Sequence, residues 1–336
     1  MSGSAFPILV TGGAGFIGSE LIAQLAAEGN CVRVLDNFAT GSRENLAGLP
    51  PESVTIVEGD VRDARRLAEV MPHGGTVFHL ACLGVRHSLR APMENHDVNA
   101  SGTLTMLEAA RAAGVTRFIH VSSSEIYGPA RTVPMSEEHP AFPTTVYGAA
   151  KLAGESYARA AFATHGFPVV VVRPFNAFGP RCHHEGDSGE VIPRFLLRML
   201  AGREVVVFGD GEQKRDFTHV SDTARGIRLA GCVDAAVGGS FNLGSGRERT
   251  IREVADAVAR ALRLPPPTVR HTAARPGDVR RLIADSSLAG RVLGYKPRVD
   301  FEDGLRQLAE WYRARGLAPE TLLKNEIERN WEGAAA

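Results

Sequence analysis

Three side chains near the middle of the chain have the types and spacing of a proton-transfer site. Tyr147 and Lys151 lie four residues apart in the run VYGAAK, so a helix there would place both on one face. An unperturbed tyrosine has a pKa near ~10, and a lysine cation ~4 Å away contributes about 4 kcal/mol, which brings a phenol toward neutrality. Such a phenol can remove an alcohol proton. Ser123, in VSSSEIYG, would hydrogen-bond the same substrate oxygen.

A glycine-rich turn near the N-terminus indicates what could accept the hydride. Gly12, Gly15 and Gly18 stand between an apolar run and a helical pattern, where glycines let the backbone approach a pyrophosphate. Asp36 ends the next apolar run, and its carboxylate would accept hydrogen bonds from ribose hydroxyls and repel a 2′-phosphate. A glycine motif alone would also fit a surface turn. The order strand, turn, helix, strand, acid predicts NAD rather than NADP, and it makes Tyr147 more than a chance match.

Short apolar runs alternate with helical patterns through the first half of the chain. We predict strands in FPILV, CVRVLDN, SVTIVEGDV, TVFHLAC, RFIHV and PVVVVRPFN. Helices are expected between most of them, notably over Asn99–Ala113 and Val146–His165. Strands alternating with helices predict a parallel sheet covered on both faces. The expected fold class is therefore α/β, a Rossmann doubly wound parallel sheet.

After about residue 174 the pattern changes. Loops rich in Gly and Pro surround a strand-like EVVVFGDG and helices near 192–201, 220–231, 250–263 and 302–314. We predict an NAD-binding domain of residues 1–174 and a smaller C-terminal substrate-binding domain made mainly of residues 175–330. Part of the second half is expected to return to the first domain. The terminal GAAA is expected to be frayed.

Composition limits the classes of function. The chain of 336 residues has 38 Lys+Arg and 38 Asp+Glu, which argues against a nucleic-acid partner because that needs a cationic surface. No stretch is long and apolar enough for a membrane span or a signal peptide. The four cysteines form no CxxC pair, which argues against disulfides or zinc. We expect a cytoplasmic enzyme without a membrane partner.

The run RCHHEGDSGE raises the question of a metal. It places His183, His184, Glu185 and Asp187 close in sequence, but adjacent histidines rarely bind one ion without further ligands. A polar lid over the substrate is the preferred interpretation, and a plain solvated loop is the alternative. No metal is predicted.

Taken together, these motifs resemble the extended short-chain dehydrogenase/reductase family, specifically its NAD-dependent nucleotide-sugar epimerases and dehydratases. The resemblance runs almost end to end, through TGGAGFIG, LDN, GDV, HLA, VN, SSSEIYG, YGAAK, RPFNAFGP, GDGEQKRDFTHVSD, NLGSG and RPGD. It implies NAD as cofactor, a nucleoside-diphosphate sugar as substrate, and a homodimer built on the helices at 99–113 and 146–165.

The resemblance extends the set of expected site residues. The expected catalytic residues are Ser123, Ser124, Glu125, Tyr147 and Lys151. The expected cofactor-binding residues are Gly12, Gly15, Phe16, Ile17, Gly18, Asp36, Asn37, Asp60, Val61, Leu80, Ala81, Asn99, Tyr147, Lys151 and Pro174. The expected substrate-binding residues, with arginines suited to phosphate oxygens, are Arg86, Ser123, Asn176, Val191, Arg215, Arg275 and Asp278.

In this family, oxidation of the sugar at C4 opens three routes: 4-epimerisation, 4,6-dehydration, and decarboxylation of a uronic acid. Dehydratases and decarboxylases resemble TDEVYG or TSEVYG and use the glutamate, whereas this chain has Ser-Ser-Glu ending at Glu125 and lacks the aspartate. Asp216 stands where decarboxylases often have a smaller residue. GVRHSLRAP, with Arg86, resembles GVRYSLENP of the UDP-glucuronate 4-epimerases.

We therefore predict a nucleoside-diphosphate-sugar 4-epimerase. A 4,6-dehydratase or a uronate decarboxylase that uses Glu125 is the alternative. In the epimerase, Glu125 would orient the sugar or order the loop, unless it is only a solvated carboxylate at a strand end. A non-catalytic NAD-binding sensor is an alternative of another class, but it would have no need of Ser123, Tyr147 and Lys151.

Overall fold

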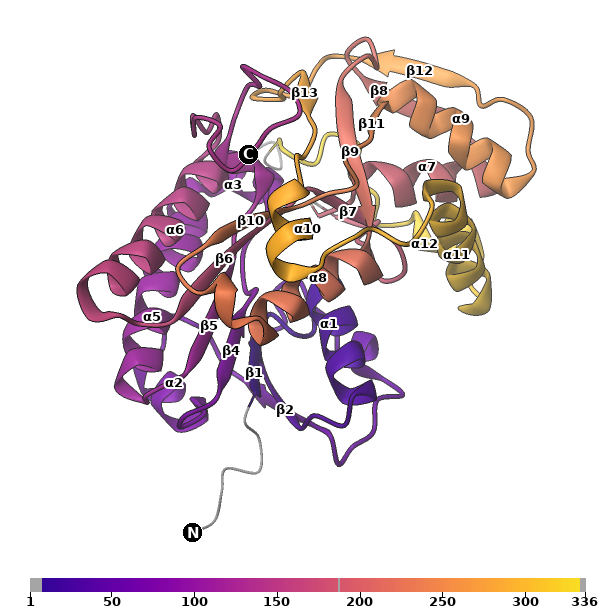
Figure 1. The fold of residues 1–336 in the computed structure, drawn as a ribbon. Helices are drawn as coiled ribbons and strands as arrows, with labels where there is room; N and C mark the ends of the chain where they lie inside the picture. The colour runs from indigo at the N-terminus through magenta and orange to yellow at the C-terminus, as the bar shows by residue number, and fades with distance from the viewer. Residues whose placement is uncertain (1–7, 187, 333–336) are drawn as a thin grey trace.

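The computed structural model describes residues 8–186 and 188–332, and the terminal GAAA lies outside them. Seven parallel strands form the central sheet in the order β10-β6-β5-β4-β1-β2-β3 (Figure 1). Their bounds are β1 Ile8–Thr11, β2 Val32–Asp36, β3 Val54–Glu58, β4 Thr76–His79, β5 Arg117–Val121, β6 Val169–Pro174 and β10 Ser240–Leu243. The six runs predicted from the sequence are all strands, and β10 is an addition from the second half of the chain.

Helices cover both faces of this sheet, because alternate strand residues point to opposite sides. Ile8 and Val10 belong to one core cluster and Leu9 belongs to the other. The first face is covered by α1 (Phe16–Ala27), α8 (Val220–Cys232) and α10 (Ser287–Leu293). The second is covered by α2 (Ala64–Val70), α5 (Gly102–Ala112) and α6 (Val146–His165). The predicted doubly wound α/β fold is confirmed.

The helix predicted over Asn99–Ala113 begins earlier than expected. Helical backbone starts at α4 (Pro92–His96), passes through a π-helical turn at Asp97–Ser101 and continues as α5. Proline suits the first helical turn because its missing N–H would have no partner there. A π-turn is a local widening often found at functional sites, and it contains Asn99.

A second layer packs beside the carboxyl ends of the strands, at the upper right of Figure 1. Its helices are α7 (Val191–Leu200), α9 (Ile251–Leu262), α11 (Phe301–Ala314) and α12 (Pro319–Leu322). One small sheet is centred on β9 (Lys214–His219), which pairs with β7 (Asn176–Phe178), β11 (Glu248–Thr250) and β13 (Arg281–Leu282). A second sheet consists of β8 (Val205–Phe208) and β12 (Val269–Thr272). This layer has its own apolar core, formed mainly by α7, α9 and α11.

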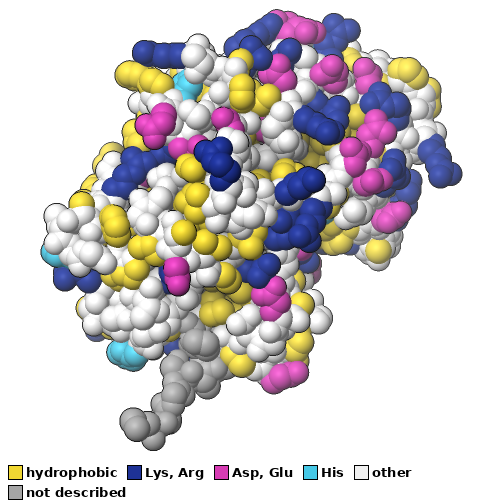
Figure 2. Space-filling view, viewed as in Figure 1, with side chains coloured by type: hydrophobic (Ala, Val, Ile, Leu, Met, Phe, Trp, Pro, Cys, Tyr) yellow, Lys and Arg dark blue, Asp and Glu magenta, His cyan; other side chains and the backbone are white. Residues whose placement is uncertain are grey.

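Short elements complete the chain. They are the helix α3 (Val85–Arg90) and the 3-10 turns Arg43–Leu46, Ser124–Ile126 and Asp234–Ala236. Cationic and anionic side chains are both spread over the face seen in Figure 2, mainly on the second layer. Within residues 8–186 and 188–332, no helix combines the length and apolar character needed to cross a bilayer.

A buried polar cluster fixes α6 on the sheet. The guanidinium of Arg173, on β6, donates to both carboxylate oxygens of Glu155, on α6, at 2.9 and 2.8 Å. Arg173 also donates to the Tyr127 hydroxyl at 2.7 Å, which in turn donates to Asn242 on β10 at 2.7 Å. Glu155 is fully buried and Arg173 is 3% exposed. The cluster therefore sets where α6 lies relative to β6 and β10.

Replacing Arg173 tests this cluster. Arg173→Met should lower the free energy of unfolding by about 3–5 kcal/mol, because it leaves the carboxylate of Glu155 buried without its main partner. Arg159 is the matched control, since it pairs with the same carboxylate at 2.8 Å but its side chain is 46% exposed. Arg159→Met should cost about 1 kcal/mol or less. Urea denaturation measures both, and equal losses would contradict the assignment.

Candidate active site

One cavity of about 480 Å³ lies between the carboxyl ends of the central strands and the second layer. Parallel α/β sheets place their ligand sites at this edge. The cavity brings together side chains from across the whole chain. Its lining includes the predicted residues Gly12, Gly15, Phe16, Ile17, Gly18, Asp36, Asn37, Asp60, Val61, Leu80, Ala81, Arg86, Ser123, Ser124, Glu125, Tyr147, Lys151, Pro174, Asn176, Val191, Arg215, Arg275 and Asp278.

Asn99 is the predicted site residue that does not line the cavity. Its side chain is buried in the π-turn, where the amide nitrogen donates to the Leu83 carbonyl at 2.8 Å and the amide oxygen accepts from the Leu83 N–H at 2.9 Å. Leu83 itself lines the cavity, in the loop after β4. Asn99 therefore acts on the site through the backbone that it holds.

The glycine turn before α1 leaves room for backbone contact with a phosphate. Gly12 has φ +68°, and a Cβ there would lie 2.7 Å from the backbone nitrogen of Ala81. A Cβ on Gly18 would lie 2.2 Å from the Gly12 carbonyl oxygen. Gly15 caps α1 without a side-chain hydrogen bond, so the first N–H groups of the helix stay open to an anion. These residues fit the pyrophosphate of a dinucleotide.

Acidic and amide groups stand at the ends of β2 and β3, beside the turn. The buried carboxylate of Asp36 accepts from the backbone N–H groups of Ala14 and Phe38 at 2.9 and 2.8 Å, which leaves lone pairs for ribose hydroxyls. Burial raises its pKa. Asn37 donates to Asp60 at 3.0 Å. The hydrogen bond from Arg62 is the largest of several effects that lower the pKa of Asp60 to about 2. This corner fits an adenosine.

Tyr147 and Lys151 reach the cavity from the first turns of α6. The helix starts at Thr145, whose hydroxyl accepts from the Gly148 N–H at 3.1 Å. A Cβ on Gly148 would lie 2.6 Å from the Glu125 carbonyl oxygen, so the glycine lets α6 pack closely against the Ser-Ser-Glu turn. Ser123 follows β5 by two residues, and its hydroxyl lies close enough to Tyr147 to lower the pKa of the phenol. The predicted catalytic residues Ser123, Tyr147 and Lys151 therefore line one wall.

The electrostatics of this wall differ from the expectation. Lys151 donates from Nζ to the Val121 carbonyl at 2.6 Å, and burial lowers its pKa. Burial raises the pKa of Tyr147 above its ordinary value, Cys82 and Glu125 add to the rise, and the hydrogen bond from Ser123 opposes it. We expected the Lys151 cation to bring the phenol toward neutrality, whereas in the protein alone desolvation moves the pKa of Tyr147 in the opposite direction.

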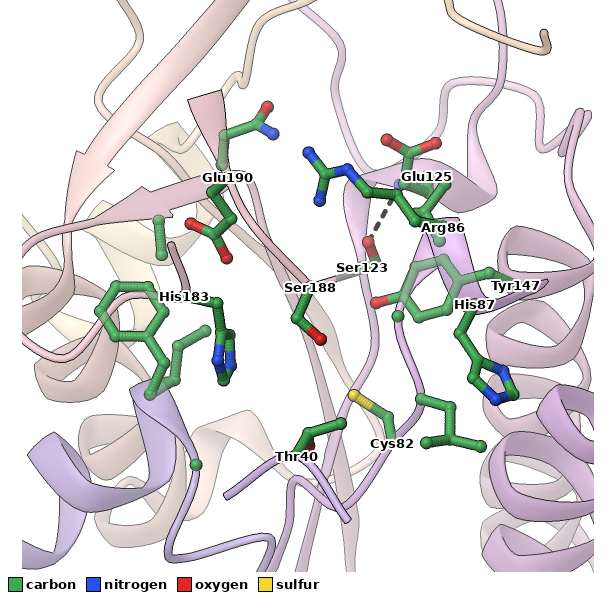
Figure 3. A pocket seen from close by; sticks show the side chains of 18 of the residues that line it. Thr40, Cys82, Arg86, His87, Ser123, Glu125, Tyr147, His183, Ser188 and Glu190 are labelled. Carbon is green, nitrogen blue, oxygen red and sulfur yellow. Dashed lines mark hydrogen bonds between the residues drawn. The ribbon is translucent and has the colours of Figure 1, made fainter. Parts of the chain in front are cut away.

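Carboxylates flank a guanidinium at the opposite end of the wall. In Figure 3, Arg86 lies between Glu125, which follows β5, and Glu190, which caps α7. Burial raises the pKa of Glu190 to about 7, against the opposing effect of Arg86. Burial lowers the pKa of Arg86 to about 10, and nearby Arg275 contributes. Glu190 was not predicted, although its place just before a helical run was visible.

Several other lining residues were also missed. Cys82 follows β4, and Figure 3 shows its sulfur beside Tyr147. Its place just after a strand of the parallel sheet could have suggested it. The remaining missed residues include Thr40, His87, Ser188, Arg194, Arg198, Phe208, Gln213 and Trp331.

The predicted phosphate-binding arginines share one carboxylate. Arg215 and Arg275 donate to the same Asp278 oxygen at 2.5 and 2.7 Å. A guanidinium has five N–H donors, so both arginines keep donors for phosphate oxygens. The side-chain oxygen of Asn176 is buried without a hydrogen-bond partner, which suits contact with a ligand that fills the cavity.

Two sequence interpretations change with the structure. His183 lines the cavity, but His184 is buried with its ring against Tyr312, so the adjacent histidines do not form one polar lid. Asp187 lies outside the described residues. Within the described ranges, no three His, Cys, Asp or Glu side chains are placed to hold a metal ion.

Asp216 is a structural residue. It is fully buried, and its carboxylate accepts from backbone N–H groups of Ser245, Gly246 and Ala284 at 2.8, 2.9 and 3.1 Å. These bonds join β9 to the 244–246 loop, and Asp216 does not line the cavity. The presence of Asp216 therefore does not count against decarboxylation.

The raised pKa of Glu190 predicts how stability depends on pH. The folded protein holds this proton up to about pH 7, whereas a glutamate has a usual value of 4.5. Since the folded state binds more protons in this window, Glu190 makes stability fall as pH rises from 4.5 to 7. Glu190→Gln should therefore gain stability over wild type across that range, measured by urea denaturation. For Glu185→Gln, an exposed change in the same loop, the free energy of unfolding should change with pH as it does in the wild type. The same pH dependence in Glu190→Gln would contradict the assignment.

The sequence and the fold were compared with known proteins. Residues 8–244 match the model of the NAD dependent epimerase/dehydratase family. The chain is 37% identical to a UDP-glucose 4-epimerase of Mycolicibacterium smegmatis, over 91% of this chain and 98% of that protein. It is also 37% identical to a dTDP-glucose 4,6-dehydratase of Actinoplanes sp., with the same coverage.

A solved structure shows the same arrangement. The UDP-glucose 4-epimerase of Thermotoga maritima, solved with UDP-glucose, superposes with a TM-score of 0.86 at 33% identity, over 92% of this chain and 99% of that one. The expected family and the expected NAD cofactor are thereby confirmed. The chain belongs to the NAD-dependent epimerase/dehydratase family, within the extended short-chain dehydrogenases/reductases.

Proposed function

We propose that this protein is a nucleoside-diphosphate-sugar 4-epimerase that works through a transient 4-keto sugar. The observation that carries the proposal is the cavity itself, which joins the glycine turn at Gly12 to the wall formed by Ser123 and Tyr147. Position 124, where the dehydratases resembled by this chain carry an aspartate, holds a buried serine. Serine cannot act as the acid that expels a hydroxyl group at neutral pH.

Each wall residue has a task in this reaction. The glycine turn and Asp36 would hold NAD, which would supply reversible hydride transfer at C4. Tyr147 removes the proton from the C4 hydroxyl, and Ser123 hydrogen-bonds the same oxygen. Lys151, held by the Val121 carbonyl at 2.6 Å, places a buried positive charge near the phenol. Lys151 is buried and Tyr147 is half-buried, which limits the access of bulk water to the proton transfer.

Epimerisation also needs the intermediate to present its other face. Figure 3 shows Glu125, Arg86 and Glu190 in one part of the cavity, and the proposal places the sugar beside them. Two carboxylates and one guanidinium can exchange hydrogen bonds with different sugar hydroxyls, so the 4-keto sugar stays bound while it turns. Tyr147 then returns the proton to the same oxygen as the hydride goes back.

One observation favours 4,6-dehydration as the second candidate. Dehydration needs one group to remove the C5 proton and another to protonate the leaving C6 hydroxyl. Glu190 has a pKa of about 7 and lies across Arg86 from Glu125, so the pair offers an acid and a base. Identity to an epimerase and to a dehydratase is the same, 37%.

Solvent deuterium separates the two routes. With UDP-glucose or dTDP-glucose in D₂O, the wild type should form the C4 epimer without deuterium at C5 or C6, because the hydride returns to the carbon it left. NMR and mass spectrometry of the product give the result. Deuterium at C5 together with loss of the C6 hydroxyl would establish dehydration instead. The same product analysis would reveal loss of carbon dioxide if a UDP-uronic acid is supplied.

Removing the phenol tests the base. Tyr147→Phe should lower kcat at least about 100-fold, the scale of general-base catalysis, and leave bound NAD unchanged. Tyr157→Phe is the matched control, because Tyr157 lies on the same helix and packs into the core away from the cavity. Absorbance of the denatured protein measures NAD content. An active Tyr147→Phe enzyme would refute the role of Tyr147 as the base.

A further inference from the structure

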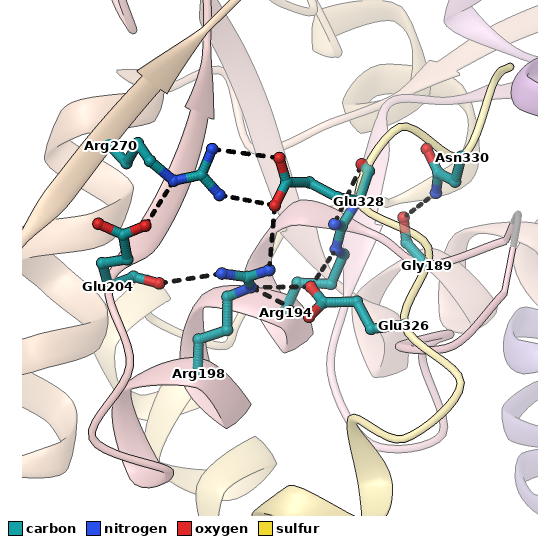
Figure 4. A network of polar contacts seen from close by, with 8 residues as sticks. All are labelled: Gly189, Arg194, Arg198, Glu204, Arg270, Glu326, Glu328 and Asn330. Carbon is teal, nitrogen blue, oxygen red and sulfur yellow. Dashed lines mark hydrogen bonds and ion pairs between the residues drawn. The ribbon is translucent and has the colours of Figure 1, made fainter.

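The segment of residues 325–331, called here the C-terminal strap, lies in the second layer beside Arg194, Arg198 and Arg270 (Figure 4). It runs beside the loop before α7, where the Gly186 N–H donates to the Asn325 carbonyl at 3.0 Å. Its last residue, Trp331, is 7% exposed and lines the cavity. The end of the described chain thus contributes to the same cavity as the glycine turn at its start.

Two arginines of α7 bind the strap. The carboxylate of Glu326 accepts from Arg194 at 3.0 Å and from Arg198 at 2.9 and 3.1 Å. Arg194 also donates to the Glu328 carbonyl at 3.2 Å. The side chains of Arg194, Arg198 and Glu326 are 8%, 11% and 6% exposed, so these ion pairs are largely removed from water.

The strap is also held at its other end. Arg270, on β12, donates to the Glu328 carboxylate at 2.6 Å, and Asn330 donates to the Gly189 carbonyl at 3.0 Å. Gly189 directly precedes Glu190, the cap of α7. Contacts at Glu326, Glu328 and Asn330 thus hold the segment that leads to Trp331.

Trp331 and Phe208 form an aromatic corner. Their ring centroids are 4.6 Å apart and the rings are nearly perpendicular, at 83°. Both rings line the cavity, together with Val206 and Gln213. A flat heterocycle can stack on one face of such a corner while its edge meets the other ring. Such a surface suits a nucleobase.

The helix α7 relates this corner to the reaction centre. Glu190, at its start, lies beside Arg86 at the sugar end, and Arg194 and Arg198 follow one and two turns later. At 1.5 Å per residue, Arg198 lies about 12 Å further along the axis than Glu190. Both arginines line the cavity, and Arg198 lies 3.6 Å from Glu328 of the strap. Arg194 and Arg198 thus lie between the sugar end and the aromatic corner. This order matches that of a nucleoside-diphosphate sugar, in which the diphosphate lies between the sugar and the base.

We propose that the C-terminal strap is a substrate-binding element: Trp331, with Phe208, receives the nucleobase of the nucleoside-diphosphate sugar. This inference rests on the proposed function and names its base-binding residues. The ion pairs of Glu326 and Glu328 position the indole, and they leave Arg194 and Arg198 with further N–H donors toward the diphosphate.

Tryptophan fluorescence tests the contact directly, because the chain has only two tryptophans. Trp311 packs on α11 against Tyr312 and Arg315, away from the cavity. In the NAD-loaded Trp311→Phe variant, titration with UDP or dTDP should change the Trp331 emission saturably. Emission that stays constant while calorimetry shows the nucleotide to bind would overturn the inference.

Affinity provides the second test. In the NAD-loaded protein, Trp331→Ala should weaken binding of UDP and dTDP about tenfold, the scale of one base–aromatic stack, and raise KM for the sugar nucleotide more than it lowers kcat. Trp331→Phe should recover most of the affinity. Trp311→Ala, the matched control, should bind as wild type does, and NAD content should be equal in all variants.

The outcomes separate the two proposals. If wild type binds UDP or dTDP and Trp331→Ala binds it equally well, the strap inference is wrong and the proposed function stands. If wild type binds neither nucleotide and turns over no sugar nucleotide, the proposed function fails, and the strap inference fails with it.

Discussion

The site depends on one buried ion pair, between Arg173 on β6 and Glu155 on α6. A charge pair removed from water is stable only with nearly complete hydrogen bonding, and here both carboxylate oxygens and the Tyr127 hydroxyl take part. That requirement leaves α6 one position on the sheet. Tyr147 and Lys151, on the first turns of α6, are thereby aimed at the ends of the strands.

Close backbone approach is the second constraint. Gly12 and Gly18 let the turn before α1 pack against itself and against the loop after β4, and Gly148 lets α6 meet the Ser-Ser-Glu turn. In each place a Cβ would overlap backbone atoms that cannot move away. The cavity therefore has walls made partly of main chain, which presents fixed N–H groups to a dinucleotide and keeps the reacting groups near one another.

Desolvation acts on the titratable groups along the whole cavity. Burial raises the pKa of Tyr147 and lowers that of Lys151, because it disfavours the charged form of each group. At the sugar end the same effect raises the pKa of Glu190 to about 7. Perturbed titratable groups gathered in one cavity are typical of functional sites.

The sequence by itself determined the features that are local in the chain. The glycine turn, the acid at Asp36 and the spacing of Tyr147 and Lys151 each depend on residues within one strand, turn or helix, where periodicity and backbone geometry act. The α/β fold follows from the same local alternation. Tertiary structure decided the rest: Asn99 acts through Leu83, Asp216 joins loops, and Glu190 and Trp331 reach the cavity. These positions depend on contacts between distant segments, such as Glu326 with Arg194, and no local pattern encodes which charges will pair or what their burial does to them.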